Sequence, residues 1–234
     1  GDKYMSINKN FFRFSFLTIF TLSISANVPD GAFTSLHVSA KNVDAYVDYM
    51  KKNTAAFEQI GSDVAGVCVT KTGNEYPGEM FVWNAYPSIE KAFQSSELYD
   101  PFKATDEFKK LRKVLYSATW KPLKEFELKP GYERLWRVNL SDPIAFAQKM
   151  TKLEKELNEA GHDMRIGVFQ PMGGGTETFH LRAVSNNASE SGKVADGYFA
   201  GESYGKTWDD AFAKYVTAVV TQTTEFCEII YTKS

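Results

Sequence analysis

The sequence matches itself when it is shifted by about 100 residues. Capping, apolar and glycine positions of the first half fall on like positions of the second: Asn42 on Asp142, Tyr46 on Phe146, Met50 on Met150, Phe57 on Leu157 and Gly61 on Gly161. Further on the shift falls to about 98 residues, where Phe81-Val82-Trp83 aligns with Phe179-His180-Leu181. Because a fixed period marks a structural repeat, both halves are expected to form the same series of elements.

Each half carries signals for a strand, a helix, a hairpin, a second helical region and a last strand. Asn42 and Asp142 are good helix N-caps, and Gly61 and Gly161 suit the position just beyond a helix. The first half is predicted to contain strands at 33–40, 64–71, 79–86 and 122–128, and helical regions at 42–61 and 88–117. The second half is predicted to contain a strand ending near 140, strands at 165–170, 177–184 and 224–231, and helical regions at 142–161 and 189–223.

This order of elements predicts an α+β fold of two tandem ferredoxin-like βαββαβ repeats, at residues 32–129 and 132–234, joined by Lys129-Pro130-Gly131. Each repeat would carry helices on one face of a four-stranded antiparallel sheet and leave the other face bare. Two bare faces in one chain can cover each other. We therefore expect the two sheets to pack as a closed or nearly closed barrel with the helices outside.

The repeated element order resembles the dimeric α+β barrel superfamily, which includes antibiotic-biosynthesis monooxygenases, EthD-like and NIPSNAP-like proteins and chlorite dismutases. The resemblance spans residues 32–234 and rests on element order and repeat symmetry, without a short diagnostic motif. It implies an intramolecular pseudo-dimer, which is either a monomer or a homodimer in solution. It also implies a small aromatic or haem ligand held between sheet and helices.

Alternation along the strands sorts the side chains into two faces, because successive residues of a strand point in opposite directions. The positions expected to face the helices are Leu36, Val38, Ala40, Phe81, Trp83 and Ala85, with Trp136, Val138, Leu140, Phe179, Leu181 and Ala183 in the second half. The positions expected to face the interior are Ser35, His37, Ser39, Val82, Asn84 and Tyr86, with Leu135, Arg137, Asn139, His180, Arg182 and Val184.

Two of the three histidines therefore share the predicted interior with two arginines and two asparagines. His37 and His180 are the candidate catalytic residues, since a histidine can carry a proton near neutral pH. The candidate ligand-binding residues are Asn84, Arg137, Asn139 and Arg182. The alternative is that these side chains pair with one another and with Glu125, Glu127 or Glu225, fix how the halves dock, and bind no ligand.

Composition and spacing argue against several classes of protein. A net charge of -2 and a pI near 6.0 give no positive field for nucleic acid. The histidines lack metal-ligand spacing, so neither a metal nor a cofactor is expected, although haem needs only a single histidine. Cys68 and Cys227 are too far apart in sequence to indicate a disulfide scaffold or a thiolate zinc site, and two buried unpaired thiols are expected.

Residues 1–28 resemble a secretory signal peptide, with basic residues at Lys9 and Arg13 before an uncharged run at 14–26. Cleavage would leave no membrane span and place the protein in the periplasm or outside the cell. The alternative is an ordered N-terminal strand in a cytoplasmic protein.

Three functions follow from these observations. The first is an exported small-molecule-binding protein with no assignable reaction, whose ligand is small and aromatic. The second is a cofactor-independent monooxygenase acting on an aromatic or quinol-like substrate, in which Arg137, Arg182 or Asn84 would stabilise an oxyanion. The third is a structural interaction module without a ligand.

Overall fold

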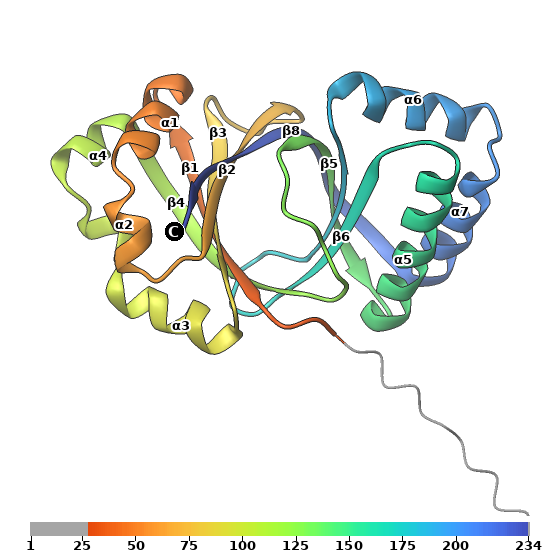
Figure 1. The fold of residues 1–234 in the computed structure, drawn as a ribbon, viewed down its shortest axis with the longest axis horizontal. Coiled ribbons are helices and arrows are strands. Elements are labelled where there is room, and N and C mark those ends of the chain that lie inside the picture. The colour runs from red at the N-terminus through yellow and green to blue at the C-terminus, as the bar shows by residue number, and fades with distance from the viewer. Residues whose placement is uncertain (1–27, 234) are drawn as a thin grey trace, which may run out of the picture.

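The computed structural model describes residues 28–233 and shows one closed antiparallel barrel with helices outside it on two opposite sides (Figure 1). The strands are β1 (Ala32–Ala40), β2 (Val64–Thr72), β3 (Glu79–Tyr86), β4 (Arg112–Pro122), β5 (Gly131–Leu140), β6 (Met164–Pro171), β7 (Phe179–Ser185) and β8 (Val216–Thr232). Their order around the barrel is β1-β3-β2-β8-β5-β7-β6-β4. The predicted signal segment, 1–28, lies outside the described residues except for Val28.

The helices form two groups, which flank the barrel on opposite sides, at left and right in Figure 1. The first group is α1 (Val43–Lys52), α2 (Ala55–Gln59), α3 (Ile89–Leu98) and α4 (Asp106–Leu111), with a short 3₁₀ helix at Pro101–Lys103. The second group is α5 (Pro143–Glu159), α6 (Ala188–Phe199) and α7 (Tyr204–Tyr215). None of the helices between residues 28 and 233 has the length and apolar character needed to cross a membrane.

The predicted fold class, two tandem ferredoxin-like repeats with facing sheets, is wrong. β8 is hydrogen-bonded to β2 from Val64↔Thr232 to Thr72↔Thr224, and β6 pairs with β4 from Trp120↔Pro171 to Pro122↔Phe169. These two pairings join the halves edge to edge, so the described residues form one continuous barrel instead of two packed sheets. The sequence pattern reports which face of a strand is apolar, but it carries no signal for which strand edges meet.

The boundaries of two strands also differ from expectation. The helical region predicted at 88–117 ends at Leu111, where β4 begins at Arg112, and β4 ends at Pro122, where the predicted strand at 122–128 was expected to begin. In the second half, α7 ends at Tyr215 and β8 starts at once, eight residues earlier than the predicted 224. The early segment of β8 is rich in β-branched side chains, which fit a pleated surface better than a helix, and that of β4 includes Val114 and Tyr116.

The predicted N-caps and C-terminal glycines of two helical regions are confirmed. Asn42 and Asp142 each accept a hydrogen bond from the backbone N–H three residues on, at 3.0 Å. Gly61 and Gly161 have φ values of 69° and 90°, a left-handed conformation that suits glycine. The region predicted at 42–61 is broken near Asn53 into α1 and α2.

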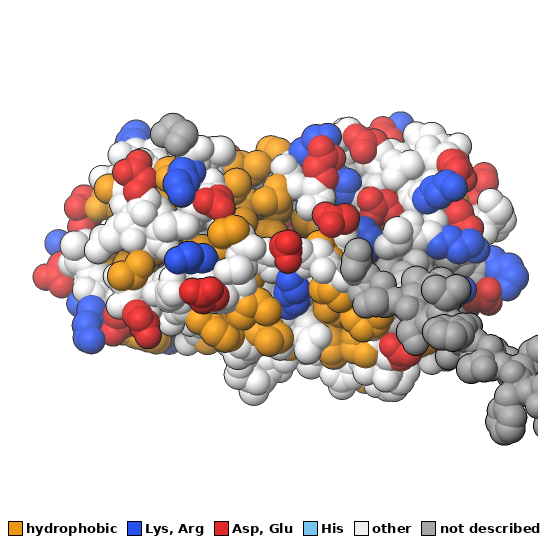
Figure 2. Space-filling view, turned by 60° about the horizontal axis from the view of Figure 1, so that its bottom comes forward, with side chains coloured by type: hydrophobic (Ala, Val, Ile, Leu, Met, Phe, Trp, Pro, Cys, Tyr) orange, Lys and Arg blue, Asp and Glu red, His pale blue; other side chains and the backbone are white. Residues whose placement is uncertain are grey.

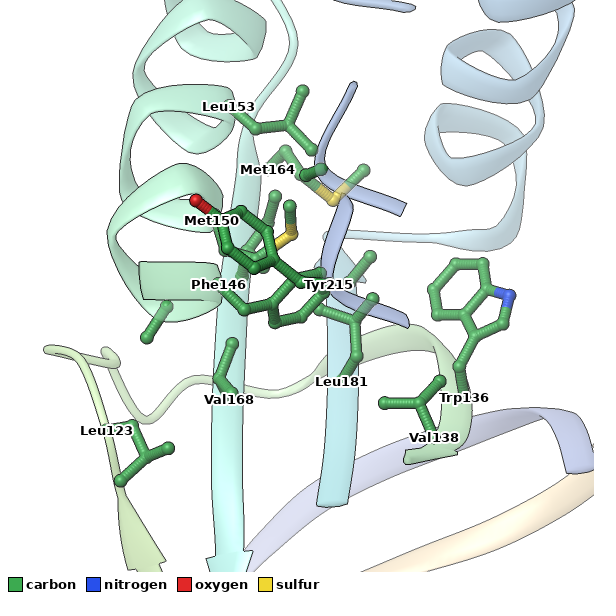
Figure 3. Packing of buried hydrophobic residues seen from close by; sticks show 14 of the residues in the cluster. Leu123, Trp136, Val138, Phe146, Met150, Leu153, Met164, Val168, Leu181 and Tyr215 are labelled. Carbon is green, nitrogen blue, oxygen red and sulfur yellow. The ribbon is translucent and has the colours of Figure 1, made fainter. Parts of the chain in front are cut away.

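Apolar stripes of the helices pack on the outer face of the barrel. In the larger core, drawn in Figure 3, Phe146, Met150 and Leu153 of α5 lie against Val168 of β6 and Leu181 of β7. All five side chains are at most 2% exposed. Fully burying such a side chain stabilises the fold by roughly 1.5–3 kcal/mol. In Figure 2, charged side chains gather over the two ends, while hydrophobic ones are concentrated near the middle.

Candidate functional site

Four of the six predicted site residues converge inside the barrel. His37 on β1 pairs with Phe81 on β3, and Arg137 on β5 pairs with His180 on β7. Arg182 follows two residues after His180 and therefore points the same way. Asn139, near the end of β5, is exposed, and its carbonyl accepts a hydrogen bond from Thr217, so it does not join this group.

Asn84 also lies outside this group, because the two faces of β3 are the reverse of those predicted. Phe81 and Trp83 point into the barrel and contact the Cys68 and Cys227 pair, while Val82 packs in the core beneath the helices. Asn84 shares the face of Val82 and points toward the helices. Both faces of β3 are largely apolar, so alternation alone does not fix the register of this strand.

Glu177, which precedes β7, is the centre of the interior group. It accepts hydrogen bonds from Tyr116 at 2.6 Å, from the Arg137 Nε at 3.0 Å and from the His180 Nε2 at 2.9 Å. His37 lies 3.7 Å from the same carboxylate. Although burial alone would raise it, the hydrogen bond from His180 and the charges of its neighbours hold the pKa of Glu177 well below its usual value.

Both interior histidines are neutral at physiological pH. Burial lowers the pKa of His37 to about 3 and holds that of His180 well below its ordinary value. The Nε2–H of His180 donates to Glu177, so its Nδ1 is the acceptor for the Arg182 Nη2 at 3.2 Å. Because both ring nitrogens are occupied, His180 has no free lone pair with which to take a proton or ligate iron.

A second carboxylate group lies deeper in the barrel. The Arg182 Nη1 donates to Glu133 at 2.6 Å and to Glu225 at 3.3 Å, and Thr223 donates to Glu225 at 3.1 Å. Burial raises the pKa of Glu133 to about 7, with Glu225 adding to the effect and Arg182 opposing it. The interior charges are therefore paired with one another, which favours the docking alternative for this network.

The docking alternative expected the interior side chains to pair with Glu125, Glu127 or Glu225, and only one of these three glutamates does so. Glu225 joins it as expected, whereas Glu127 forms an ion pair with Lys129 and the backbone carbonyl of Glu125 accepts from Lys124. Glu133 was overlooked, although it continues the Leu135 and Arg137 face two residues earlier. Glu177 was missed because the predicted strand at 177–184 put it on the helix-facing side with Phe179; β7 begins only at Phe179, so strand alternation does not fix the direction of Glu177.

The expectation of two unpaired thiols is wrong. Cys68 on β2 and Cys227 on β8 are directly opposite each other and form a disulfide, 159 residues apart in sequence. The pairing of β2 with β8 brings them together. The disulfide borders a small interior cavity of about 80 Å³ that is lined mainly by aromatic rings, including Phe81, Trp83 and Trp120.

A larger cavity of about 140 Å³, called here the first chamber, lies between the barrel wall and the first group of helices. Its apolar lining includes Leu36, Met50, Phe57, Val82 and Phe108; its polar lining includes Asn84, Tyr86, Ser95, Tyr99 and Arg112. No aspartate, glutamate or histidine is found among its described lining residues.

Two buried polar atoms of the first chamber have no hydrogen-bond partner: the Oδ1 of Asn84 and the hydroxyl of Tyr86. Asn84 uses its amide nitrogen to donate to Thr34, which leaves the amide oxygen available. Ser95 and Thr34 lie near the Tyr86 hydroxyl without hydrogen-bonding geometry. Since buried polar groups are nearly always paired, unpartnered atoms in a cavity indicate a site for a polar group that comes from outside.

Arg112, at the start of β4, supplies a buried positive charge to the same chamber. It donates to the hydroxyls of Tyr46 and of Tyr99, the latter at 2.7 Å, and its guanidinium lies 4.9 Å from the ring centre of Phe108. Only 6% of the residue is exposed. Two phenol hydroxyls and an aromatic ring are its partners, and no carboxylate among residues 28–233 forms an ion pair with it.

A second chamber of about 240 Å³ lies between the barrel and α5, α6 and α7, and is lined mainly by apolar side chains such as Trp136, Tyr204 and Trp208, together with Arg134 and Ser191. None of its described lining atoms is buried without a hydrogen-bond partner. It contains neither histidine nor cysteine, and the Tyr204 hydroxyl donates to a backbone carbonyl at 2.8 Å. Since His180 has both ring nitrogens in hydrogen bonds and no histidine or cysteine lines the second chamber, neither His180 nor this chamber offers an axial ligand for haem.

Comparison with known proteins shows likeness in fold alone. No known protein family and no curated protein matches the sequence. A proposed monooxygenase from Lactobacillus acidophilus superimposes with a TM-score of 0.54 at 9% identity, covering 86% of this chain and 95% of that one. A heme-binding protein from Thermus thermophilus gives 0.53 at 10% identity, covering 85% and 91%. A proposed chlorite dismutase gives 0.51 at 9% identity, covering 85% and 95%.

At 9–10% identity these superpositions show that this chain shares the overall fold of the three solved structures. The resemblance noted in the sequence is thus confirmed for the barrel.

Proposed function

We propose that this protein binds a small, mostly apolar anion, such as a single-ring aromatic carboxylate or phenolate, in the first chamber. The observation that carries the proposal is the buried Arg112 guanidinium without a carboxylate partner. A buried charge without a counter-charge is costly, and an anionic ligand would supply the missing charge through strong hydrogen bonds. The unpartnered Tyr86 hydroxyl would donate to the anion and fix its orientation, while the Asn84 amide oxygen, which accepts, would favour a ligand that carries a donor such as a ring hydroxyl.

The size of the chamber limits the ligand. Its volume of about 140 Å³ is close to the roughly 150 Å³ of an engineered protein cavity that binds benzene. Met50, Phe57 and Phe108 provide apolar contacts for one ring. This agrees with the small aromatic ligand expected from the sequence.

The proposal is one of binding, and it includes no reaction. Proton abstraction from a bound phenol needs a general base within hydrogen-bond reach, and the described lining of the first chamber provides no carboxylate or imidazole. His37 and His180 are neutral and held in the interior network. The chamber therefore favours a ligand-binding protein over the monooxygenase alternative, and over an interaction module without a cavity.

Export remains part of this proposal. The Cys68–Cys227 disulfide supports it, because disulfides form and persist in oxidising compartments. Cell fractionation combined with N-terminal sequencing of the mature protein tests it. A mature chain that lacks residues 1–28 is the expected result, and a cytoplasmic chain that retains them would contradict export.

Calorimetric titration with benzoate, phenol and benzyl alcohol tests the ligand class. Benzoate should bind more tightly than benzyl alcohol, which has a similar shape and no charge. Arg112→Gln should weaken benzoate binding at least tenfold and change benzyl alcohol binding little. Arg134→Gln, in the second chamber, is the matched control and should bind benzoate like the wild type. Equal benzoate affinity in wild type and Arg112→Gln would overturn the proposal.

A further inference from the structure

Four potential metal ligands meet inside the barrel, away from the first chamber. Cys68 on β2, Cys227 and Glu225 on β8, and Glu133 on β5 each place a donor atom so that all four lie within 4.8 Å of one another. All four residues are buried, with at most 7% of their surface exposed. An oxygen of Glu133 lies 3.3 Å from the Cys68 sulfur and in direct contact with that of Cys227.

We propose that reduction of the Cys68–Cys227 disulfide opens a Cys₂Glu₂ site for a zinc-type divalent cation. A disulfide sulfur is a poor metal ligand, whereas a thiolate is a strong one. A dithiol reductant donates two electrons; the S–S bond breaks, two protons complete two thiols, and the dithiol becomes a disulfide. The cation then displaces both thiol protons and binds two sulfurs and two carboxylate oxygens.

The donor set and its dimensions suit zinc. Structural zinc sites are tetrahedral, with bonds of roughly 2.0–2.3 Å to sulfur and oxygen, which places neighbouring donors about 3.3–3.8 Å apart. Donor pairs at the upper limit of 4.8 Å would close by about 1 Å, while the two sulfurs would move apart once the bond between them is broken. Strands β5 and β8 are paired at Glu133↔Glu225, and β2 and β8 at Cys68↔Cys227, so the backbone already holds the ligands in place.

Neighbouring side chains would support a bound cation. Arg182 donates to both carboxylates and Thr223 donates to Glu225, and such hydrogen bonds orient metal-ligating carboxylates in known sites. The cation and Arg182 together would offset most of the negative charge of two thiolates and two carboxylates. The interior cavity of about 80 Å³ touches Cys68, Cys227 and Glu133, which provides space for an entering ion.

Disulfide and metal site exclude each other, so the compartment decides which one exists. An exported protein would keep the disulfide, and a reduced one would hold the metal. None of the four residues of the proposed metal site lines the first chamber. The metal site therefore stands or fails independently of the proposed ligand.

Titration of the full chain with Co²⁺ tests the inference. The folded protein is treated with a phosphine reductant, its free thiols are counted, and Co²⁺ is added while absorbance is recorded. The reduced wild type should bind one equivalent with a thiolate-to-cobalt charge-transfer band, displaced by Zn²⁺, and the oxidised protein should bind none. Cys227→Ser should lose the band.

The carboxylates are tested separately from the thiols. Glu133→Gln and Glu225→Gln, checked for folding by circular dichroism, should each weaken Co²⁺ binding at least tenfold. Glu228→Gln, on the same strand but in a surface ion pair with Lys51, should bind like the wild type. The inference is overturned if the folded protein cannot be reduced, if the reduced wild type binds no Co²⁺, or if both glutamine variants bind it unchanged.

Discussion

Asn84 donates a hydrogen bond from its amide nitrogen to Thr34 at 3.5 Å, while its amide oxygen is buried in the first chamber without a partner. Tyr86, two residues further along the strand, has a hydroxyl that is also buried without a hydrogen-bond partner. Both residues lie on β3, which forms part of the chamber wall. The empty protein therefore carries polar groups that a ligand could satisfy, and this predicts opposite effects on stability and binding.

Tyr86→Phe should stabilise the empty protein and weaken ligand binding. Removing an unsatisfied hydroxyl relieves a desolvation cost of about 1–2 kcal/mol, while benzoate loses one possible hydrogen bond. Chemical denaturation and calorimetry measure the two effects. Tyr46→Phe is the control: its hydroxyl accepts from Arg112, so its loss should lower stability. A less stable Tyr86→Phe variant would contradict the view that this hydroxyl is unpartnered.

Glu177→Gln should destabilise the protein strongly. The carboxylate pairs with Arg137 at 3.0 Å inside the barrel, and removing one partner of a buried ion pair costs about 3–5 kcal/mol. Glu228→Gln, whose partner Lys51 is exposed, should cost less than about 1 kcal/mol. Urea unfolding of both variants measures the difference, and similar midpoints would show that the interior network contributes little.

The folded protein should lose stability as pH falls below about 6.5, the ordinary pKa of histidine. Burial lowers the pKa of His37 to about 3, so between these values the unfolded chain binds a proton that the folded chain does not. Stability then rises with pH through this window, by about 1 kcal/mol per pH unit for each such histidine, and is fully present above it. His37→Gln should flatten the slope of unfolding free energy against pH. An unchanged slope would mean that His37 titrates normally.

Reducing the disulfide should lower stability by roughly 3–5 kcal/mol in metal-free buffer, because the bond closes a long loop in the unfolded chain. The cysteines are 159 residues apart. Unfolding with and without reductant, in the presence of a chelator, measures the effect. The double variant Cys68→Ser, Cys227→Ser should show no response to reductant; a response in that variant would place its cause elsewhere.

Local signals in the sequence predicted local structure well. The Asn42 and Asp142 caps and the Gly61 and Gly161 ends were all correctly predicted, because capping depends on a few neighbouring residues. The convergence of His37, Arg137, His180 and Arg182 was also predictable, since it follows from alternation along strands with one clearly apolar face.

Long-range pairing was not predictable from these signals. The Cys68–Cys227 bond depends on β2 meeting β8, and the single barrel depends on the same edge contact. Arg112 was hidden in a segment with a helical pattern, and its importance comes from what surrounds it: Tyr46 from α1 and Tyr99 beyond α3. A buried cation without a counter-charge becomes visible only when the whole neighbourhood is assembled.

The most direct measurement is a crystal structure of the protein with benzoate, grown at a concentration where binding has been established in solution. The account predicts the carboxylate within about 3.2 Å of an Arg112 nitrogen and the ring beside Met50 and Phe57. Benzoate bound elsewhere, or a first chamber that stays empty at saturation, would contradict it.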